Sequence, residues 1–200
     1  RDGAAHDRLL SHLAVLQVLV PLLAAPLCSL VKRHRIVHGL TLVACWVSFG
    51  IAVALAMRVA DSGPFSYFLG GWSPPFGIEY RVDALTSFVL VLVSGIGAIV
   101  MTQSEASLEV EIAYDRYSLF HTMYLLSLAG LLGIVVTGDL FNVFVFLEIA
   151  ALSGYVLVSL GSDRRALVAA YQYLIMGTVG ATFLLIGIGL LFLLAFVYVL

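Results

Sequence analysis

The stretch GDLFNVFVFLEIAALSGYVL, residues Gly138 to Leu157, combines the length and apolar composition of a membrane-spanning helix with one carboxylate, Glu148. About 20 predominantly apolar residues cross a bilayer as a helix. An ionised carboxylate at the centre of such a helix costs about 2.5 to 3.5 kcal/mol on insertion scales. Intramembrane ionisable residues mark functional sites by default, so Glu148 is the first candidate.

The whole chain has the composition of an integral membrane protein. Of its 200 residues, 62% are hydrophobic and 11% are charged, with a mean hydropathy of +1.09. A soluble domain is only about 45 to 50% apolar. The net charge is -2 and the basic residues are scattered, which excludes a nucleic-acid-binding face. The lipid bilayer is therefore the first partner that the sequence predicts.

Neither a cofactor nor a metal site is predicted. Cys28 and Cys45 lie in separate apolar segments without a CxxC pair or a Cys/His cluster, so we expect two buried thiols. The sequence lacks the phosphate-loop, Rossmann, HExxH and GxSxG patterns. We do not expect the chain to be an enzyme by itself, although it could be a non-redox subunit of one.

Apolar periodicity predicts a single all-α membrane domain with about six transmembrane helices over residues 1–200. The expected helices cover about 13–31, 36–59, 84–102, 118–137, 139–160 and 166–195. Asp83 and Asp139 are expected as N-caps, and Gly138 as the end of the preceding helix. Residues 61–82 form a loop that could contain a hairpin, and the polar residues 103–117 are expected as a solvated loop. The last segment exceeds one span, which requires either a tilted helix or a turn near Gly189.

Loop charges predict the orientation of the chain. The connectors after the first, third and fifth helices carry six basic residues: Lys32, Arg33, Arg35, Arg116, Arg164 and Arg165. The N-terminal segment and the connector after the second helix carry four: Arg1, Arg8, Arg58 and Arg81. The positive-inside rule then predicts an external N-terminus in a cell (inner) membrane.

Several polar side chains could extend a proton or ion path from Glu148. Helical spacing places Tyr155 and Ser159 on its face and Asp139 on the opposite side. Thr178 and Thr182 share one face of the last helix, and their hydroxyls suit either water ordering or helix-to-helix hydrogen bonding. His121 could pass protons or be an interfacial histidine without a role. Glu148 itself could instead be a protonated, purely structural residue.

Three stretches resemble a known family. The segment at 138–157 resembles the fifth-helix motif of the antiporter-like subunits shared by Mrp-type cation/proton antiporters and respiratory complex I. GGWSPPFGIEYRVDAL at 70–85 is similar to the segment before their third helix. RRALVAAYQYLIMGTVGATFLLIGIGLL at 164–191 is similar to their sixth helix. The resemblance covers about 60–195, and its best match is with the N-terminal portion of the D-type Mrp antiporter proteins.

The resemblance implies a fold of about fourteen helices in two inverted repeats with broken helices. In that family, the glutamate at the position of Glu148 pairs with a lysine in a broken seventh helix. Lys32 is the only lysine of this sequence and lies in a loop. We therefore expect the partner lysine beyond Leu200 or on another chain. The final FLLAFVYVL also departs from the polar turn expected after the sixth helix.

The resulting hypothesis is a proton-translocating subunit of a multisubunit antiporter that exchanges Na⁺ or another monovalent cation for H⁺. Glu148 would be the switching carboxylate, and other membrane subunits would be its partners. One alternative is a proton-pumping subunit of an NADH-quinone oxidoreductase or a membrane-bound hydrogenase complex. A second alternative is a structural or assembly subunit without an ion path.

Overall fold

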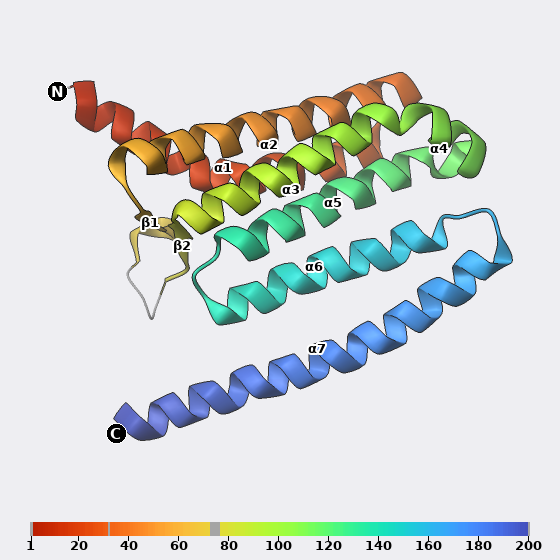
Figure 1. Ribbon diagram of the computed structural model, residues 1–200. Helices are drawn as coiled ribbons and strands as arrows, with labels where there is room; N and C mark the ends of the chain where they lie inside the picture. The colour runs from red at the N-terminus through yellow and green to blue at the C-terminus, as the bar shows by residue number, and fades with distance from the viewer. Residues whose placement is uncertain (1, 32, 73–76, 200) are drawn as a thin grey trace.

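The fold is a bundle of long helices with one small β-hairpin. The computed structural model describes residues 2–31, 33–72 and 77–199 (Figure 1). The elements are α1 (Asp2–Leu30), α2 (His34–Ser62), β1 (Phe65–Phe68), the 3₁₀ turn η1 (Leu69–Gly71), β2 (Glu79–Val82), α3 (Ala84–Gln103), α4 (Glu105–Glu111), the 3₁₀ turn η2 (Tyr114–Arg116), α5 (Tyr117–Val136), α6 (Leu140–Ser159) and α7 (Arg164–Val199). Among these residues, six helices are long and apolar enough to cross a membrane, which confirms the predicted class.

Two predicted segments differ from the observed ones. The first helix begins at Asp2 instead of residue 13, although its membrane-compatible part begins at His12. It continues through Pro21 and Pro26, as membrane helices tolerate. The connector at 103–117, expected as a solvated loop, contains the short helix α4 with the sequence EASLEVE. Glu, Ala and Leu are strong helix formers, so polarity alone was a poor guide there.

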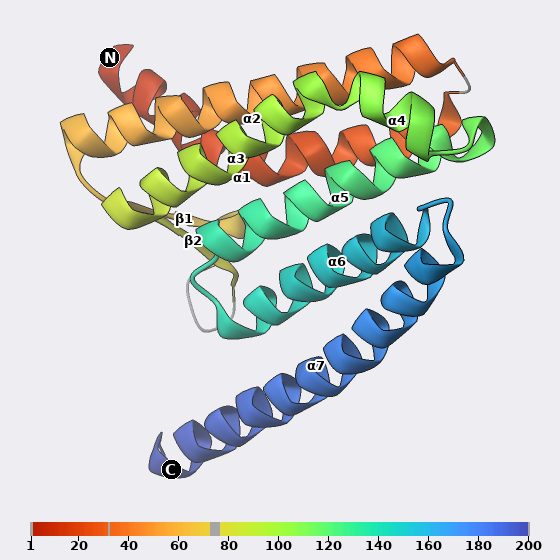
Figure 2. The same ribbon diagram turned by 45° about the vertical axis from the view of Figure 1, so that its right-hand side comes forward.

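The helices are arranged around α5. It packs against α1 on one side and α6 on the other, while α2 packs against both α1 and α3. Figures 1 and 2 show α6 between α5 and α7, with both termini at the end of the bundle that carries the hairpin. The short helix α4 lies at the opposite end (Figure 1). The fully buried core includes Leu55, Leu90, Leu125 and Leu132.

The last helix, α7, is continuous over 36 residues, so the alternative of a turn near Gly189 is wrong. At 1.5 Å per residue it is about 54 Å long, which exceeds a hydrocarbon core of about 30 Å. It packs on α6, and most of its other side chains are exposed. Its length therefore requires tilt or an extension beyond the bilayer.

Two glycines bring α5 and α6 into close contact. A Cβ added to Gly130 would lie 2.7 Å from the backbone nitrogen of Ala150 and 2.8 Å from the carbonyl oxygen of Phe146. A Cβ at Gly133 would collide with the Phe146 ring. Small residues allow membrane helices to approach in this way. The two helices are connected at residues 137–139, where the sequence predicts the boundary between them.

The β-hairpin, which the sequence left open, is present and docks on this α5–α6 turn. Its strands are antiparallel, with Phe65 opposite Val82. Tyr80 forms an isolated bridge with Thr137, and the Gly138 amide donates to the Glu79 carbonyl at 2.8 Å. Helix α5 therefore ends at Val136. Gly138 binds the hairpin, so the prediction that it terminates the helix is wrong.

Both predicted acidic N-caps are confirmed. The Asp83 carboxylate accepts from the Thr86 amide at 2.8 Å, and the Asp139 carboxylate accepts from the Phe141 amide at 3.2 Å. The Thr86 amide holds the pKa of Asp83 below its ordinary value. A carboxyl with a lowered folded-state pKa stabilises the fold above its unfolded pKa, and this contribution is lost as the pH falls through the folded value.

Replacing Asp83 with Ala should lower the free energy of unfolding by about 1 kcal/mol at neutral pH, because the first turn of α3 loses its cap. Asp83→Asn should retain most of that stability, since Asn is also a good N-cap. Thermal unfolding of the full-length subunit in detergent measures both changes. Equal losses for the two variants would contradict the capping role.

Candidate intramembrane carboxylate site

Glu148 lies near the middle of α6, eight residues after its first residue Leu140 and therefore about 12 Å along the helix. Its side chain is half-buried. Among the described residues, no hydrogen bond or ion pair reaches its carboxylate. Because this carboxylate has no fixed partner, a cation or a proton donor that approaches it can change its protonation state.

Tyr155, which is predicted to share a helix face with Glu148, packs against α7. It lies two turns along α6 from Glu148. Its ring is 8% exposed and meets Tyr173 of α7 edge-on, with the ring centroids 4.7 Å apart. Its hydroxyl faces Gly177, where a side chain would collide with it. Helix α7 thus positions this phenol.

Ser159 completes the face at the polar end of α6. Its hydroxyl donates to the Val156 carbonyl at 2.7 Å. It also lines a cavity of about 470 Å³ at the α6–α7 turn, together with Arg116, Asp163 and Arg164. The structure therefore arranges Glu148, Tyr155 and Ser159 from the middle of the helix to an open polar cavity.

Thr178 and Thr182 are not brought to this face. Both are exposed, and each donates to a carbonyl of its own helix at 2.8 Å, those of Leu174 and Thr178 respectively. Gly177 faces α6 instead. The two hydroxyls therefore lie on the outer surface of α7, where any partner would have to come from outside these residues.

His121 belongs to a different part of the bundle. It is fully buried, whereas the sequence left open an interfacial position. Its ring contacts His38 of α2 and Tyr117 of its own helix, with centroid separations of 5.5 and 4.7 Å. The coverage by neighbouring helices explains its burial. The predicted residues therefore lie in three places: Glu148, Tyr155 and Ser159 on one face of α6, Thr178 and Thr182 on the outer surface of α7, and His121 in the bundle core.

Other buried polar groups were not anticipated. Gln17 is fully buried without a hydrogen-bond partner among the described residues. The Asn142 side-chain amide donates to the Thr137 hydroxyl at 3.0 Å and links the first turn of α6 to the residue that follows α5. In the sequence, each of the two is a single amide side chain within an apolar segment, and this pattern could have identified both. Cys28 and Cys45 are free and buried, as expected, and the described residues contain no group of three potential metal ligands.

Replacing Tyr155 with Phe should keep the packing against Tyr173 but remove the hydroxyl that faces Gly177. The loss of one hydrogen-bonding group, worth about 1 kcal/mol, should slow proton movement about fivefold without changing thermal unfolding. Tyr173→Phe is the matched control, because it alters the same ring pair from the α7 side. Equal effects of the two changes on proton flux would contradict a role for the Tyr155 hydroxyl in the path.

These features define a multi-pass α-helical membrane protein with a carboxylate near the middle of α6 that has no hydrogen-bond or ion-pair partner among the described residues. Residues 137–197 match the family model described as NADH:quinone oxidoreductase/Mrp antiporter, TM. This range contains Glu148 together with α6 and most of α7. This part of the chain therefore matches the transmembrane family shared by NADH:quinone oxidoreductase and Mrp antiporter subunits, as the motif at 138–157 predicted.

Similar proteins occur in both kinds of assembly. NADH-quinone oxidoreductase subunit N of Desulforudis audaxviator is 40% identical over 185 residues, covering 91% of this chain and 36% of that protein. The putative antiporter subunit mnhD2 of Staphylococcus epidermidis is 33% identical over 187 residues, covering 92% and 36%. The chain therefore spans about a third of the length of these relatives.

Two solved complexes share the fold. A chain of the Mrp complex from a Dietzia species is 27% identical with a TM-score of 0.81, covering 90% of this chain and 34% of that one. A chain of the archaeal membrane-bound sulfane sulfur reductase is 26% identical, also with a TM-score of 0.81, covering 87% and 36%. Subunits of multisubunit membrane complexes thus have this helix arrangement.

Proposed function

We propose that the protein is a proton-translocating subunit of a multisubunit antiporter that exchanges Na⁺ or another monovalent cation for H⁺. Glu148 is its switching carboxylate. The apolar surroundings disfavour the anion and so raise the proton affinity of Glu148, and an approaching cation lowers it. The subunit lies in the cell membrane with its N-terminus outside and works with other membrane subunits.

The single observation that carries this proposal is the placement of Glu148. It is half-buried at mid-depth, without an ion pair or hydrogen bond among the described residues, and it lies on a face that leads to an open polar cavity. A structural carboxylic acid would be expected to donate a hydrogen bond across the helix interface. An unpaired one retains the freedom to exchange its proton.

The remaining parts of the proposed path follow from the face of Glu148. Tyr155 and Ser159 carry protons between Glu148 and the cavity at the α6–α7 turn. Thr178 and Thr182 contribute hydroxyls on the outer face of α7, where another segment or subunit of a fourteen-helix fold would contact them. The lysine that pairs with Glu148 is supplied from outside these 200 residues.

The alternative is a proton-pumping subunit of a redox complex. The identity of 40% with an oxidoreductase subunit and the fold shared with a sulfane sulfur reductase complex favour it. The second alternative, an assembly subunit without an ion path, predicts that Glu148 tolerates Gln or Ala.

Native purification of the full-length protein from its own membranes distinguishes the first two functions. The antiporter predicts co-purifying membrane subunits without iron-sulfur Cys motifs, together with Na⁺-dependent proton flux in everted vesicles. Co-purification of iron-sulfur subunits with quinone-dependent proton flux would overturn the antiporter assignment and support the redox complex.

A further inference from the structure

A second group of titratable side chains lies at the α4 end of the bundle, away from α6. The rings of His38 (α2) and His121 (α5) meet nearly perpendicular, with an interplanar angle of 77° and centroids 5.5 Å apart. His121 is fully buried, and neither of its ring nitrogens has a hydrogen-bond partner among the described residues. The Nδ1 atom of His38 is likewise buried without one.

Leaving such nitrogens unpaired is costly. A buried donor or acceptor without a partner costs about 1 to 3 kcal/mol, and an imidazole presents two such nitrogens. Small ring rotations or an intervening water molecule would let one nitrogen of the pair donate to the other. The two rings are therefore placed to share a hydrogen bond, and with it a proton.

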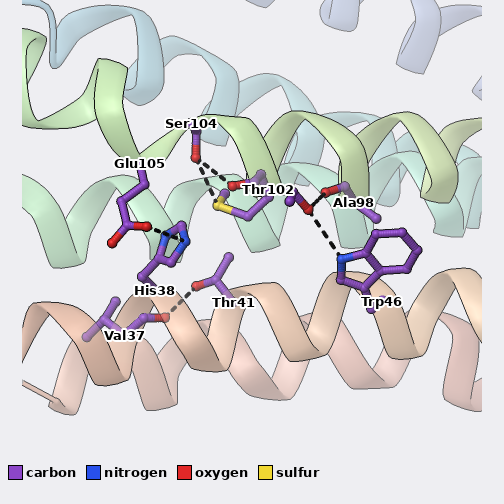
Figure 3. A network of polar contacts seen from close by, with 9 residues as sticks. Val37, His38, Thr41, Trp46, Ala98, Thr102, Ser104 and Glu105 are labelled. Atoms are coloured by element: carbon purple, nitrogen blue, oxygen red, sulfur yellow. Dashed lines mark hydrogen bonds and ion pairs between the residues drawn. The ribbon is translucent and has the colours of Figure 1, made fainter.

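A carboxylate lies next to this pair from the outside. The Oε2 atom of Glu105 lies 3.9 Å from Nε2 of His38, and Figure 3 shows Glu105 reaching from α4 toward His38 on α2. The Glu105 side chain is 60% exposed and that of His38 only 12%. A positive charge on His38 therefore has a solvated counter-ion at its outer side.

Two cavities of about 370 and 340 Å³ lie at the same end of the bundle as the pair. Both are lined by His34, Tyr114 and Tyr117, and Glu105 lines the larger one. The His34 ring lies 3.7 Å from Tyr114 and 4.6 Å from Tyr117 between centroids. Since Tyr117 also contacts His121, aromatic groups with ionisable or hydroxyl edges connect the cavities with the buried ring.

We propose that His38 and His121 together form a proton-binding site that takes up one proton from these cavities, with Glu105 as its counter-ion. The proton leaves hydronium in the cavity as an N–H bond forms on the imidazole pair. The site goes beyond the path proposed for Glu148, which is no part of it, and gives a function to His121, the candidate for passing protons that the sequence singles out. The other titratable groups on the surrounding elements are His34 on α2, Tyr117 on α5, Glu105 on α4 and, on α1, Cys28, whose thiol forms a hydrogen bond with Thr41.

The test is a pH titration of the histidine side-chain ¹⁵N signals of the full-length subunit in lipid nanodiscs. Across about pH 4 to 9, which brackets the ordinary histidine range, the His38 and His121 signals should change together. His38→Gln should shift the midpoint of His121 by about one pH unit, and His121→Asn should do the same to His38. Glu105→Gln should move both midpoints to lower pH.

His12→Gln is the matched control. His12 accepts or donates a hydrogen bond with Tyr67 at the hairpin end, so its loss should leave the pair unchanged. The exposed Glu105→Gln change also keeps the test informative if a histidine variant fails to fold. A His121 signal that stays in one neutral tautomer over the whole range, or that does not respond to His38→Gln and Glu105→Gln, overturns the proposal.

The same titration in a Glu148→Gln background separates this site from the carboxylate. An unchanged histidine titration, whatever the variant does to proton flux, supports a separate site. A displaced titration would show that the imidazoles and Glu148 form a single coupled unit and would contradict the proposal.

Discussion

Replacing Glu148 with Gln is expected to lower cation-dependent proton flux in everted vesicles by about two orders of magnitude or more, the contribution typical of a group that transfers protons. The Gln side chain has the size of Glu, but its amide does not exchange a proton as a carboxyl group does. Because Glu148 makes no hydrogen bond or ion pair among the described residues, its replacement should leave subunit assembly intact.

Ser153→Ala is the matched control on the same helix. Ser153 is buried, but its hydroxyl donates to the carbonyls of Ile149 and Ala150 in its own helix. Its loss should leave proton flux near that of the unchanged protein. Undiminished flux with Glu148→Gln would support the assembly-subunit alternative and remove the basis for the proposed path.

The second large effect is expected at Gly130. In Gly130→Ala the new methyl group meets the backbone of Phe146 and Ala150, which cannot move aside like a flexible side chain. Overpacking of this kind costs about 1 to 3 kcal/mol, so the thermal stability of the full-length subunit should fall measurably. Since Phe146 and Ala150 lie on either side of Glu148, a displaced α6 should also slow proton flux.

Gly180→Ala is the control for Gly130→Ala. Gly180 is also inside a helix, but a Cβ there meets nothing within 4 Å among the described residues. The gain in helix propensity, about 1 kcal/mol per residue, should then leave stability equal or slightly higher. If Gly130→Ala behaved like Gly180→Ala, the close α5–α6 contact would be contradicted.

Features that depend on local chemistry were predictable from the sequence. Asp83 and Asp139 precede apolar runs, and both cap their helices through side-chain hydrogen bonds. The break between α5 and α6 follows from span length together with the polar residues at 137–139. The six apolar segments likewise became helices, because bilayer thickness fixes their length.

Features that depend on packing between helices were not predictable. Gly130 and Gly133 looked like any glycines of a membrane helix, and only the structure shows that Phe146 lies against them. The sequence alone does not assign a function to His38, because its partners, His121 and Glu105, are 83 and 67 positions away from it. Thr178 and Thr182 share a helix face as predicted, but spacing within one helix does not reveal which face meets α6.

The central claim is that Glu148 changes its protonation state when a cation binds. Infrared difference spectroscopy of the full-length subunit in its complex measures this directly, because a protonated carboxyl has a carbonyl stretch that the carboxylate lacks. Adding Na⁺ at constant pH should reduce a carboxylic-acid band that is absent from the Glu148→Gln variant. A difference spectrum that is the same for both proteins would contradict the switching role of Glu148.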